Sequence, residues 1–257
     1  MSKIVCVHSF RGGTGKSNLV ANIAASLAVQ GHRVGVVDTD IQSPGIHVLF
    51  GLERQQVTHT LNDYLLGRCA VDTTVFDVTQ SLNPQTSAAL TAGGGCLYLI
   101  PASMKVDEIT TILSYGYDIS LLTQGYKSLS NSLQLDYLLI DTHPGINEET
   151  LLAIGISDLL IVILRTDQQD FQGTAVTVQV AKQLGVPEMF LVVNQILPEL
   201  NPQEVKATME SAFATSVKGL LPLEPDMIKL GSRDIFSLRY PKHPLSVEIR
   251  RITTCVS

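Results

Sequence analysis

Residues 7–17 read VHSFRGGTGKS, and this stretch decides the fold. A β-branched run at 4–7 comes before it, and apolar residues follow it at Leu19, Ile23 and Leu27. A spacing of four marks one face of a helix. Glycines let the backbone wrap closely around an anion, and the unpaired N–H groups at the start of a helix attract negative charge. The stretch therefore predicts a phosphate-binding loop between a strand and a helix.

The loop also carries the side chains that a nucleoside triphosphate requires. We expect Lys16 to bridge the β- and γ-phosphates and the Ser17 hydroxyl to ligate Mg²⁺. The backbone N–H groups of residues 13–17 would surround the β-phosphate. A strict P-loop has glycine at position 10, where this chain has Phe10, so the loop is of a deviant type.

Short β-branched runs alternate along the chain with stretches of helical period, such as Val176, Val180 and Leu184. Strands that are apolar on both faces are typical of parallel βαβ units. We therefore predict an α/β fold, with a doubly wound, mostly parallel sheet flanked by helices. No repeat or linker divides the sequence, so residues 1–257 are expected to form a single domain. The predicted strands are 4–7, 33–37, 97–100, 137–140, 159–164 and 190–193.

Three segments lie outside this alternation. Residues 61–66 and 119–133 have helical patterns, but the sequence does not define their roles. Residues 83–95 include the run Gly93-Gly94-Gly95, and because glycine favours turns we expect an exposed loop there.

The composition excludes several classes of protein. Of the 257 residues, 45% are hydrophobic and 16% are charged, so the chain is too apolar to be disordered. The longest apolar run, 159–164, is much shorter than the ~20 residues that span a bilayer. The run at 4–7 is too short for a signal peptide, so we expect a cytoplasmic protein. A protein dedicated to nucleic-acid binding usually has a basic surface, and the net charge of −6 does not indicate one.

Several motifs in the same order resemble those of the MinD/ParA family of P-loop ATPases, whose deviant loop reads Lys-Gly-Gly-x-Gly-Lys-Ser/Thr. Besides the loop, the similar segments are 38–40 (DTD), 136–145 (DYLLIDTHPG), 192–194 (VVN) and 221–226 (LPLEPD). The resemblance extends from residue 2 to about residue 251. It implies binding of ATP and Mg²⁺, slow hydrolysis that a partner stimulates, and an ATP-dependent homodimer.

Three aspartates are expected near the phosphates. Asp141 ends an apolar strand at the carboxyl edge of the sheet, where it could hold Mg²⁺ through a water molecule. The resemblance implies that Asp38 also lies near the Mg²⁺ ion, together with Ser17, and that Asp40 orients the attacking water. Asp38 and Asp40 alternate, so a strand that continued through both would place them on opposite faces.

Two later segments concern the base. The resemblance implies that the Asn194 amide reads the adenine edge, and that Pro222 and Asp226 belong to a second adenine-contacting segment. A GTPase would have Asn-Lys-x-Asp, whereas this chain reads NQIL at 194–197, so guanine is not expected. The predicted nucleotide-contacting residues are Gly12, Gly13, Thr14, Gly15, Lys16, Ser17, Asn18, Asn194, Pro222 and Asp226.

The chain departs from the family pattern in two places. Arg11 occupies the position of the signature lysine, which in the family crosses a dimer interface to the partner's nucleotide. Arginine keeps the charge and offers a planar donor fork, so we expect Arg11 to act with Lys16 and Asp40 in catalysis. Alternatively, Arg11 is a surface residue and hydrolysis is impaired. Asn18 stands where the family often has threonine. We expect His8 and His143 to be structural.

The C-terminal segment, 244–257, decides whether a membrane is involved. Some members of the family end in a basic amphipathic helix that binds membranes. Here only Val247, Ile249 and Ile252 could form an apolar face, so we expect a helix that packs on the domain and no membrane binding. The end of the chain has a mild excess of basic residues, which leaves nonspecific DNA open as a partner.

The leading functional hypothesis is an ATP-driven dimer switch that positions or partitions a cargo through an unidentified partner protein. The alternative is a nucleotide-sensing binding protein with little or no hydrolysis. An ATPase of metal-cluster assembly is disfavoured, because such a protein usually needs closely spaced cysteines. The chain has no Cys-x-x-Cys pair among Cys6, Cys69, Cys96 and Cys255, so we expect reduced thiols.

Overall fold

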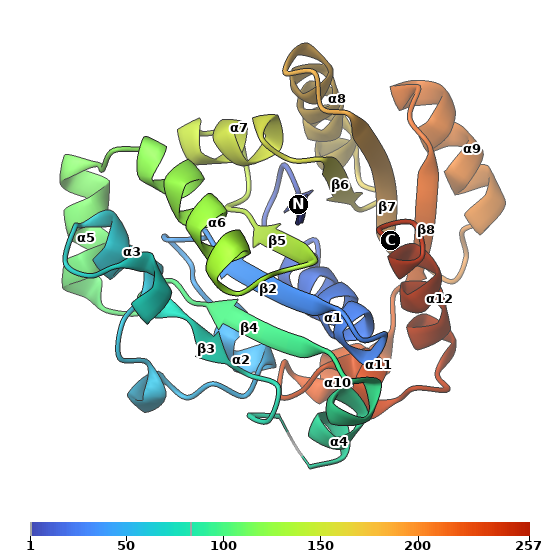
Figure 1. Cartoon of the computed structure of the whole chain (residues 1–257). Coiled ribbons are helices and arrows are strands. Elements are labelled where there is room, and N and C mark those ends of the chain that lie inside the picture. Colours follow the sequence, from blue (N-terminus) through green and yellow to red (C-terminus); the bar gives the residue numbers. More distant parts are fainter. Residues whose placement is uncertain (1, 83) are drawn as a thin grey trace.

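The computed structural model describes residues 2–82 and 84–257. Its centre is an eight-stranded sheet with the strand order β3-β4-β2-β5-β1-β6-β7-β8 (Figure 1). Every neighbouring pair is parallel except β3 and β4. The strands are β1 (Lys3–His8), β2 (Arg33–Asp38), β3 (Phe76–Asp77), β4 (Cys96–Ile100), β5 (Tyr137–Asp141), β6 (Leu159–Leu164), β7 (Glu188–Ile196) and β8 (Val217–Pro222). The predicted α/β fold with a mostly parallel sheet is confirmed.

Helices cover both faces of the sheet, and two short 3₁₀ turns, η1 (Arg54–Gln56) and η2 (Val71–Thr74), join them. The first six helices are α1 (Lys16–Val29), α2 (Ile46–Leu49), α3 (Leu61–Leu65), α4 (Pro84–Gly93), α5 (Val106–Tyr115) and α6 (Ser120–Ser132). The others are α7 (Glu148–Gly155), α8 (Gln168–Gln183), α9 (Pro202–Phe213), α10 (Pro225–Leu230), α11 (Phe236–Arg239) and α12 (Pro244–Thr253). The helices predicted at 61–66 and 119–133 are present as α3 and α6.

The sheet separates two hydrophobic cores, as the side chains of β1 illustrate. Val5 and Val7 point into the core beneath α1 and α12, whereas Cys6 points into the core beneath α6, α7 and α8. This alternation follows from the two-residue period of a strand. Because both faces are covered, the central strands are apolar throughout, which is why all six predicted strands are present.

The structure corrects the loop predicted at 83–95. Asn83 lies outside the described residues, and Pro84–Gly93 form the helix α4, whose Leu90 is buried. Gly93 lies against the end of α1, where a Cβ atom would overlap the backbone of Val29. Gly93 and Gly95 permit a close approach to the end of α1, whereas Gly94, with a φ angle of 77°, forms the turn after α4. The predicted loop is therefore wrong for residues 84–93.

Two predicted helix faces also need correction. Val176 in α8 and Leu184 just after it are exposed, and the buried face of the helix includes Thr177, Val178 and Ala181 instead. In α12, Ile249 and Ile252 are buried as predicted, but Leu245 completes the face and Val247 is exposed. The expectation that this last helix packs on the domain is confirmed, because α12 lies on α1 and β8.

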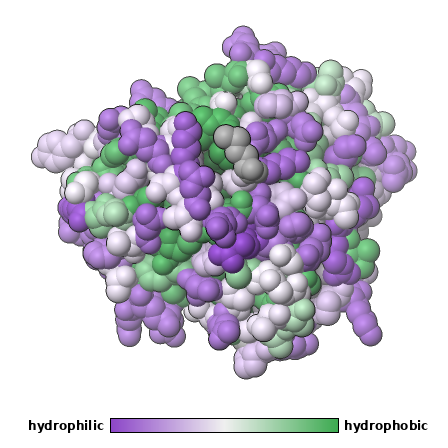
Figure 2. All heavy atoms as spheres, in the orientation of Figure 1, coloured by the Kyte–Doolittle hydropathy of each residue, from purple (hydrophilic) through white to green (hydrophobic). Residues whose placement is uncertain are grey.

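The surface mixes polar and apolar residues, and hydrophilic side chains are spread over the face drawn in Figure 2. Within residues 2–82 and 84–257, no helix is long and apolar enough to cross a membrane.

Candidate functional site

The predicted phosphate loop lies between β1 and α1, at the edge where the carboxyl ends of the central strands meet. β5 lies between β1 and β2, and its last residue, Asp141, is in register with Asp38 at the end of β2. The topology therefore brings together three segments that are far apart in the sequence. This edge is where parallel α/β sheets bind their ligands.

The loop leaves the start of α1 free for an anion. Gly13 and Gly15 have φ angles of 77° and 90°, a region that side chains other than glycine rarely adopt. Gly15 caps α1 without a side-chain hydrogen bond, and the first turn contains no acidic residue. The first N–H groups of the helix therefore face the loop without a side-chain partner, as a phosphate site requires.

Lys16 forms the central ion pair of the site. Its Nζ atom lies 2.6 Å from Oδ1 of Asp141, and the two side chains are only 6% and 1% exposed. A lysine buried in this way needs a negative partner, because an unpaired charge away from water is costly. Two residues that the sequence assigned to the γ-phosphate and to Mg²⁺ are therefore in direct contact.

Asp38 has an incompletely satisfied carboxylate beside this pair. Its Oδ1 accepts a hydrogen bond from the Asp40 N–H at 3.0 Å, but Oδ2 is buried and has no partner within the described part of the chain. Burial, together with the nearby charge of Asp141, raises the pKa of Asp38 to about 8. A divalent cation would relieve both effects, and hard oxygen donors are the ligands that Mg²⁺ prefers. The residues at this edge thus fit a magnesium ion.

Asp40 lies just beyond the end of β2, so the alternation of a strand does not apply to it. Its Oδ1 atom is 2.7 Å from Nδ1 of His143, in the loop after β5. His8, by contrast, is fully buried behind the loop and contacts the Thr142 hydroxyl at 2.9 Å. Burial lowers the pKa of His8 to about 3, so this ring is neutral.

Arg11 lies at the rim of the site with 42% of its side chain exposed. Its Nη1 atom is 3.6 Å from Oδ1 of Asp167, which caps α8. The neighbouring Phe10 packs on α8 at Gly173, where a Cβ atom would overlap the ring. The residue that replaces the usual glycine therefore attaches the loop to α8 and leaves the Arg11 side chain at the surface.

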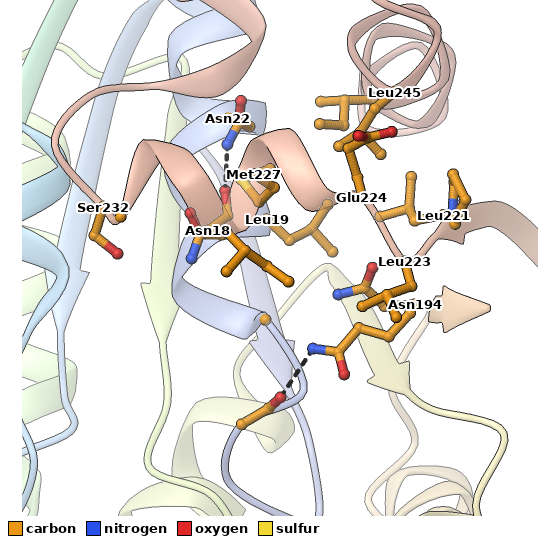
Figure 3. Close-up of a pocket in the computed structure, with 17 residues that line it drawn as sticks. Asn18, Leu19, Asn22, Asn194, Leu221, Leu223, Glu224, Met227, Ser232 and Leu245 are labelled. Carbon is orange, nitrogen blue, oxygen red and sulfur yellow. Dashed lines mark hydrogen bonds between the residues drawn. The ribbon is translucent and has the colours of Figure 1, made fainter. Parts of the chain in front are cut away.

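A cavity of about 450 Å³ opens beside the loop, between α1 and α10 (Figure 3). Asn194 and Pro222, both predicted to contact the base, line it. Asn194 donates a hydrogen bond from Nδ2 to the Thr14 carbonyl at 2.7 Å, so it links the cavity to the loop. Asp226, also predicted, forms an exposed ion pair with Lys229 at 2.8 Å.

Sequence reasoning missed most of the cavity wall. Gln195 donates to the Gly13 carbonyl at 3.1 Å, and the Glu224 carboxylate caps α10 beside the opening. Apolar side chains of Leu19, Leu221 and Met227 complete the wall. The only available signal was the segment 221–226, which indicated a base-contacting region without identifying the side chains that face it.

Comparisons with known proteins agree with this geometry. A family model described as an AAA domain matches residues 2–187. An ATP-binding protein of Methanocaldococcus jannaschii is 27% identical over 253 residues, which cover 98% of this chain and 86% of that protein. An iron–sulfur cluster carrier protein of Methanococcus maripaludis is 30% identical over 200 residues, 76% of this chain and 61% of the carrier. The solved structure of the septum site-determining protein MinD from Pyrococcus horikoshii, complexed with Mg-ADP, has a TM-score of 0.80 at 19% identity and covers 100% of this chain and 96% of that one.

Proposed function

The chain belongs to the MinD/ParA family of P-loop ATPases, and from this premise we propose that it is an Mg²⁺-ATP-dependent switch. In this proposal, ATP joins two copies into a homodimer that positions or partitions a cargo through a partner protein, and slow hydrolysis separates them. One observation carries the proposal. Lys16, Asp141 and the incompletely bonded Asp38 meet at one sheet edge, beside the free start of α1.

The site has room for both ends of a nucleotide. The phosphates would lie in the loop, and the base would enter the cavity lined by Asn194 and Pro222. The absence of an Asn-Lys-x-Asp sequence at 194–197 favours adenine over guanine. We therefore propose ATP as the nucleotide.

The ion pair supports a simple order of events at the phosphates. Lys16 must leave Asp141 to reach the β- and γ-phosphates, and this movement frees the Asp141 carboxylate. Asp141 and the Ser17 hydroxyl would then hold Mg²⁺, with Asp38 close by. The bound ion would supply positive charge to the phosphate oxygens. Asp40 would orient the attacking water, which suits a reaction governed by alignment and charge stabilisation.

Arg11 supports the proposed dimer because its side chain is exposed at the rim and could reach a second copy. There its planar guanidinium would contact the partner's phosphates. In the single chain it lies near Asp167, and exposed ion pairs of this kind contribute only about 0–1 kcal/mol. Dimerisation would therefore release Arg11 at small cost.

Opposite effects of two variants would test the switch. Arg11→Ala should bind ATP but fail to dimerise, because its charge acts only across the interface, and Arg11→Lys should restore the dimer. Asp40→Ala should bind ATP, dimerise and stop turnover, so the dimer accumulates. Light scattering with ATP measures the dimer, and calorimetry measures ATP binding. Arg54→Ala, at an exposed arginine in η1, is the matched control.

A nucleotide-sensing protein without turnover is the alternative, and it would follow if Arg11→Ala dimerised and bound ATP like the parent while neither protein released phosphate. The retained Asp40 and Asp141 argue against it. An iron–sulfur carrier function is disfavoured, because the chain has no Cys-x-x-Cys pair. Among the described residues, the cluster of three His, Cys, Asp or Glu side chains that lie close enough to share a metal ion consists of Glu224, Asp226 and His243, and it contains no cysteine.

The surface of α12 is relevant to two further partners, membranes and nonspecific DNA. Its apolar residues are buried apart from Val247, and Arg251 is held by Glu248 at 2.9 Å. We therefore propose that the protein does not bind membranes and acts in the cytoplasm. Nonspecific DNA remains a possible track for the dimer. ATP-dependent retention on duplex DNA that weakens steeply with salt would support it.

A further inference from the structure

Two loops of the candidate site are joined by a contact between two side chains, and the proposed function assigns no role to this contact. The loop after β2 (39–45) carries Asp40, and the loop after β5 (142–147) carries His143. The Nδ1 atom of His143 lies 2.7 Å from Oδ1 of Asp40, and the side chains are 21% and 14% exposed. Both side chains are therefore largely shielded from solvent, but water can still reach them.

The chemistry of the two groups fixes the direction of this hydrogen bond. An ionised carboxylate can only accept, so Nδ1 of His143 must donate. The same Oδ1 atom also accepts from the Ser43 N–H at 3.0 Å, and the backbone N–H of Asp40 is bound to Asp38. No group in the described part of the chain donates to Oδ2 of Asp40. One carboxylate oxygen is held in place, and the other is free to accept from water.

We propose that His143 is a positioning residue that holds Asp40, so that its free Oδ2 atom accepts a proton of the water attacking the γ-phosphate. This inference rests on the proposed function, in which Asp40 orients that water. Without His143, the Asp40 carboxylate could rotate about its side-chain bonds. A smaller fraction of the molecules would then hold Asp40 in the orientation that the attacking water needs. His143 also links Asp40 to the segment that begins at Asp141.

The test is single-turnover hydrolysis of Mg²⁺-ATP by the full chain, with the protein in excess over ATP and at a concentration well above the Kd. His143→Ala should lower the rate about 10- to 100-fold and leave the Kd for ATP unchanged, because His143 acts after binding. His143→Asn should recover most of the rate, since the asparagine Nδ2 atom is as far from the backbone as the ring Nδ1 and can donate. His143→Gln, which imitates Nε2 instead, should not. His59→Ala, at an exposed histidine outside the site, is the control.

The outcomes separate this inference from the function on which it rests. A parental rate in His143→Ala, or equal losses in His143→Ala and His143→Asn, would overturn the positioning role. If Asp40→Ala hydrolyses ATP at the parental rate, the role of Asp40 in the proposed function is wrong, and the inference fails with it. If Asp40→Ala is inactive while His143→Ala is fully active, only the inference fails.

Discussion

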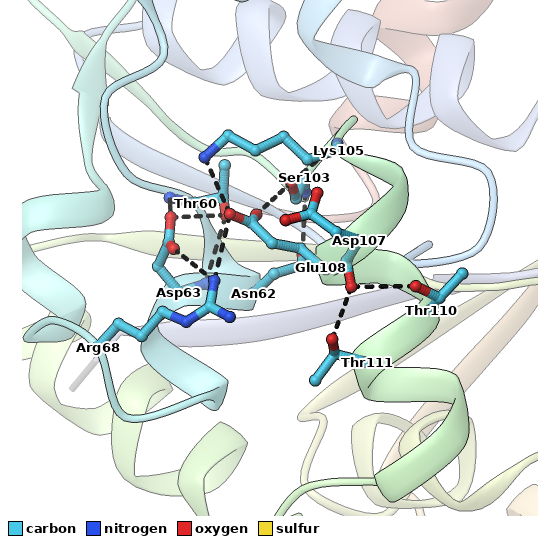
Figure 4. A network of polar contacts seen from close by, with 10 residues as sticks. All are labelled: Thr60, Asn62, Asp63, Arg68, Ser103, Lys105, Asp107, Glu108, Thr110 and Thr111. Atoms are coloured by element: carbon cyan, nitrogen blue, oxygen red, sulfur yellow. Dashed lines mark hydrogen bonds and ion pairs between the residues drawn. The ribbon is translucent and has the colours of Figure 1, made fainter.

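Two clusters of buried acids and lysines lie at the carboxyl ends of neighbouring strands, and they differ in how well their carboxylates are bonded. In the phosphate site, Asp38 leaves one oxygen buried without a partner in the described structure. Beyond the end of β4, Glu108 in α5 is also buried but has partners on both oxygens (Figure 4). Its Oε2 accepts from Ser103 at 2.5 Å, and its Oε1 accepts from Lys105 at 2.9 Å and Arg68 at 3.3 Å.

The difference separates a structural network from a binding site. Glu108, in α5, joins this helix to the loop after β4 and to Arg68 in the segment after α3, and both of its carboxylate oxygens have partners within the chain. The carboxylates near Lys16 are compensated only in part, and a buried polar atom without a partner costs free energy that a ligand can recover. We therefore expect changes around Glu108 to affect stability and changes around Lys16 to affect ATP.

The largest expected effect comes from replacing, one at a time, the two lysines that pair with buried acids. Lys16→Ala should weaken ATP binding by at least about 100-fold, because it removes the cation that faces the phosphates. Lys105→Ala should leave ATP binding unchanged, since its ammonium group pairs with Glu108, outside the phosphate site. Calorimetry with Mg²⁺-ATP measures both. Parental binding by Lys16→Ala would mean that the phosphate site lies elsewhere.

The second comparison uses one glycine from each region. Gly15 and Gly67 have φ angles of 90° and 70°, so alanine strains the backbone at both positions. Only at Gly15 would the new Cβ overlap the Asn194 side chain, whereas the space around Gly67 is open. Gly15→Ala should therefore weaken ATP binding about 10-fold or more. Gly67→Ala should cost about 1–2 kcal/mol of stability and leave the Kd for ATP unchanged.

If both glycine variants bound ATP like the parent, the contact between the loop and Asn194 would not matter for the nucleotide. Thermal unfolding of each variant is the necessary companion measurement, because it separates the shared backbone strain from the contact that is specific to Gly15.

The Glu108 network predicts an effect on stability alone. Glu108→Gln keeps the shape of the side chain but removes the charge that Lys105 and Arg68 share. We expect a loss of about 1–2 kcal/mol, at the lower end for charged hydrogen bonds because both cations are half exposed to solvent. Urea unfolding measures the loss, with ATP hydrolysis as the control. A lower rate of hydrolysis in a folded Glu108→Gln variant would contradict the separation of the two regions.

The sequence predicted the features that depend on local periodicity or on one continuous motif. Six of the eight strands, α1 and the phosphate loop are of this kind, because burial on both faces of a sheet leaves a clear apolar pattern. The sequence did not predict β3 and β8, the two strands at the edges of the sheet. Contacts between distant segments could not be predicted in this way. The pairing of Lys16 with Asp141 followed only from the strand order, and that of Asp40 with His143 from two loops without periodicity. The prediction failed at 84–93 because close helix packing and turns both use glycine, so Gly93 at the end of α4 has the same pattern as the turn at Gly94.

The smallest expected effect concerns the pH dependence of stability. Asp38 has a pKa of about 8 in the folded chain, against 3.8 for an ordinary aspartate, so the unfolded chain loses its proton first as the pH rises. The stabilisation is fully present below 3.8 and is lost as the pH rises towards 8. Between pH 6 and 8 the ligand-free protein should lose about 1–2 kcal/mol, which corresponds to a Tm lower by a few degrees.

Asp38→Asn should abolish most of this decrease, because an amide does not ionise. Glu108→Gln should show the same decrease in stability between pH 6 and 8 as the parent protein. Thermal unfolding across this range, without nucleotide or Mg²⁺, makes the comparison. An equally steep decrease in Asp38→Asn would show that the incompletely bonded oxygen of Asp38 does not control the stability of the site.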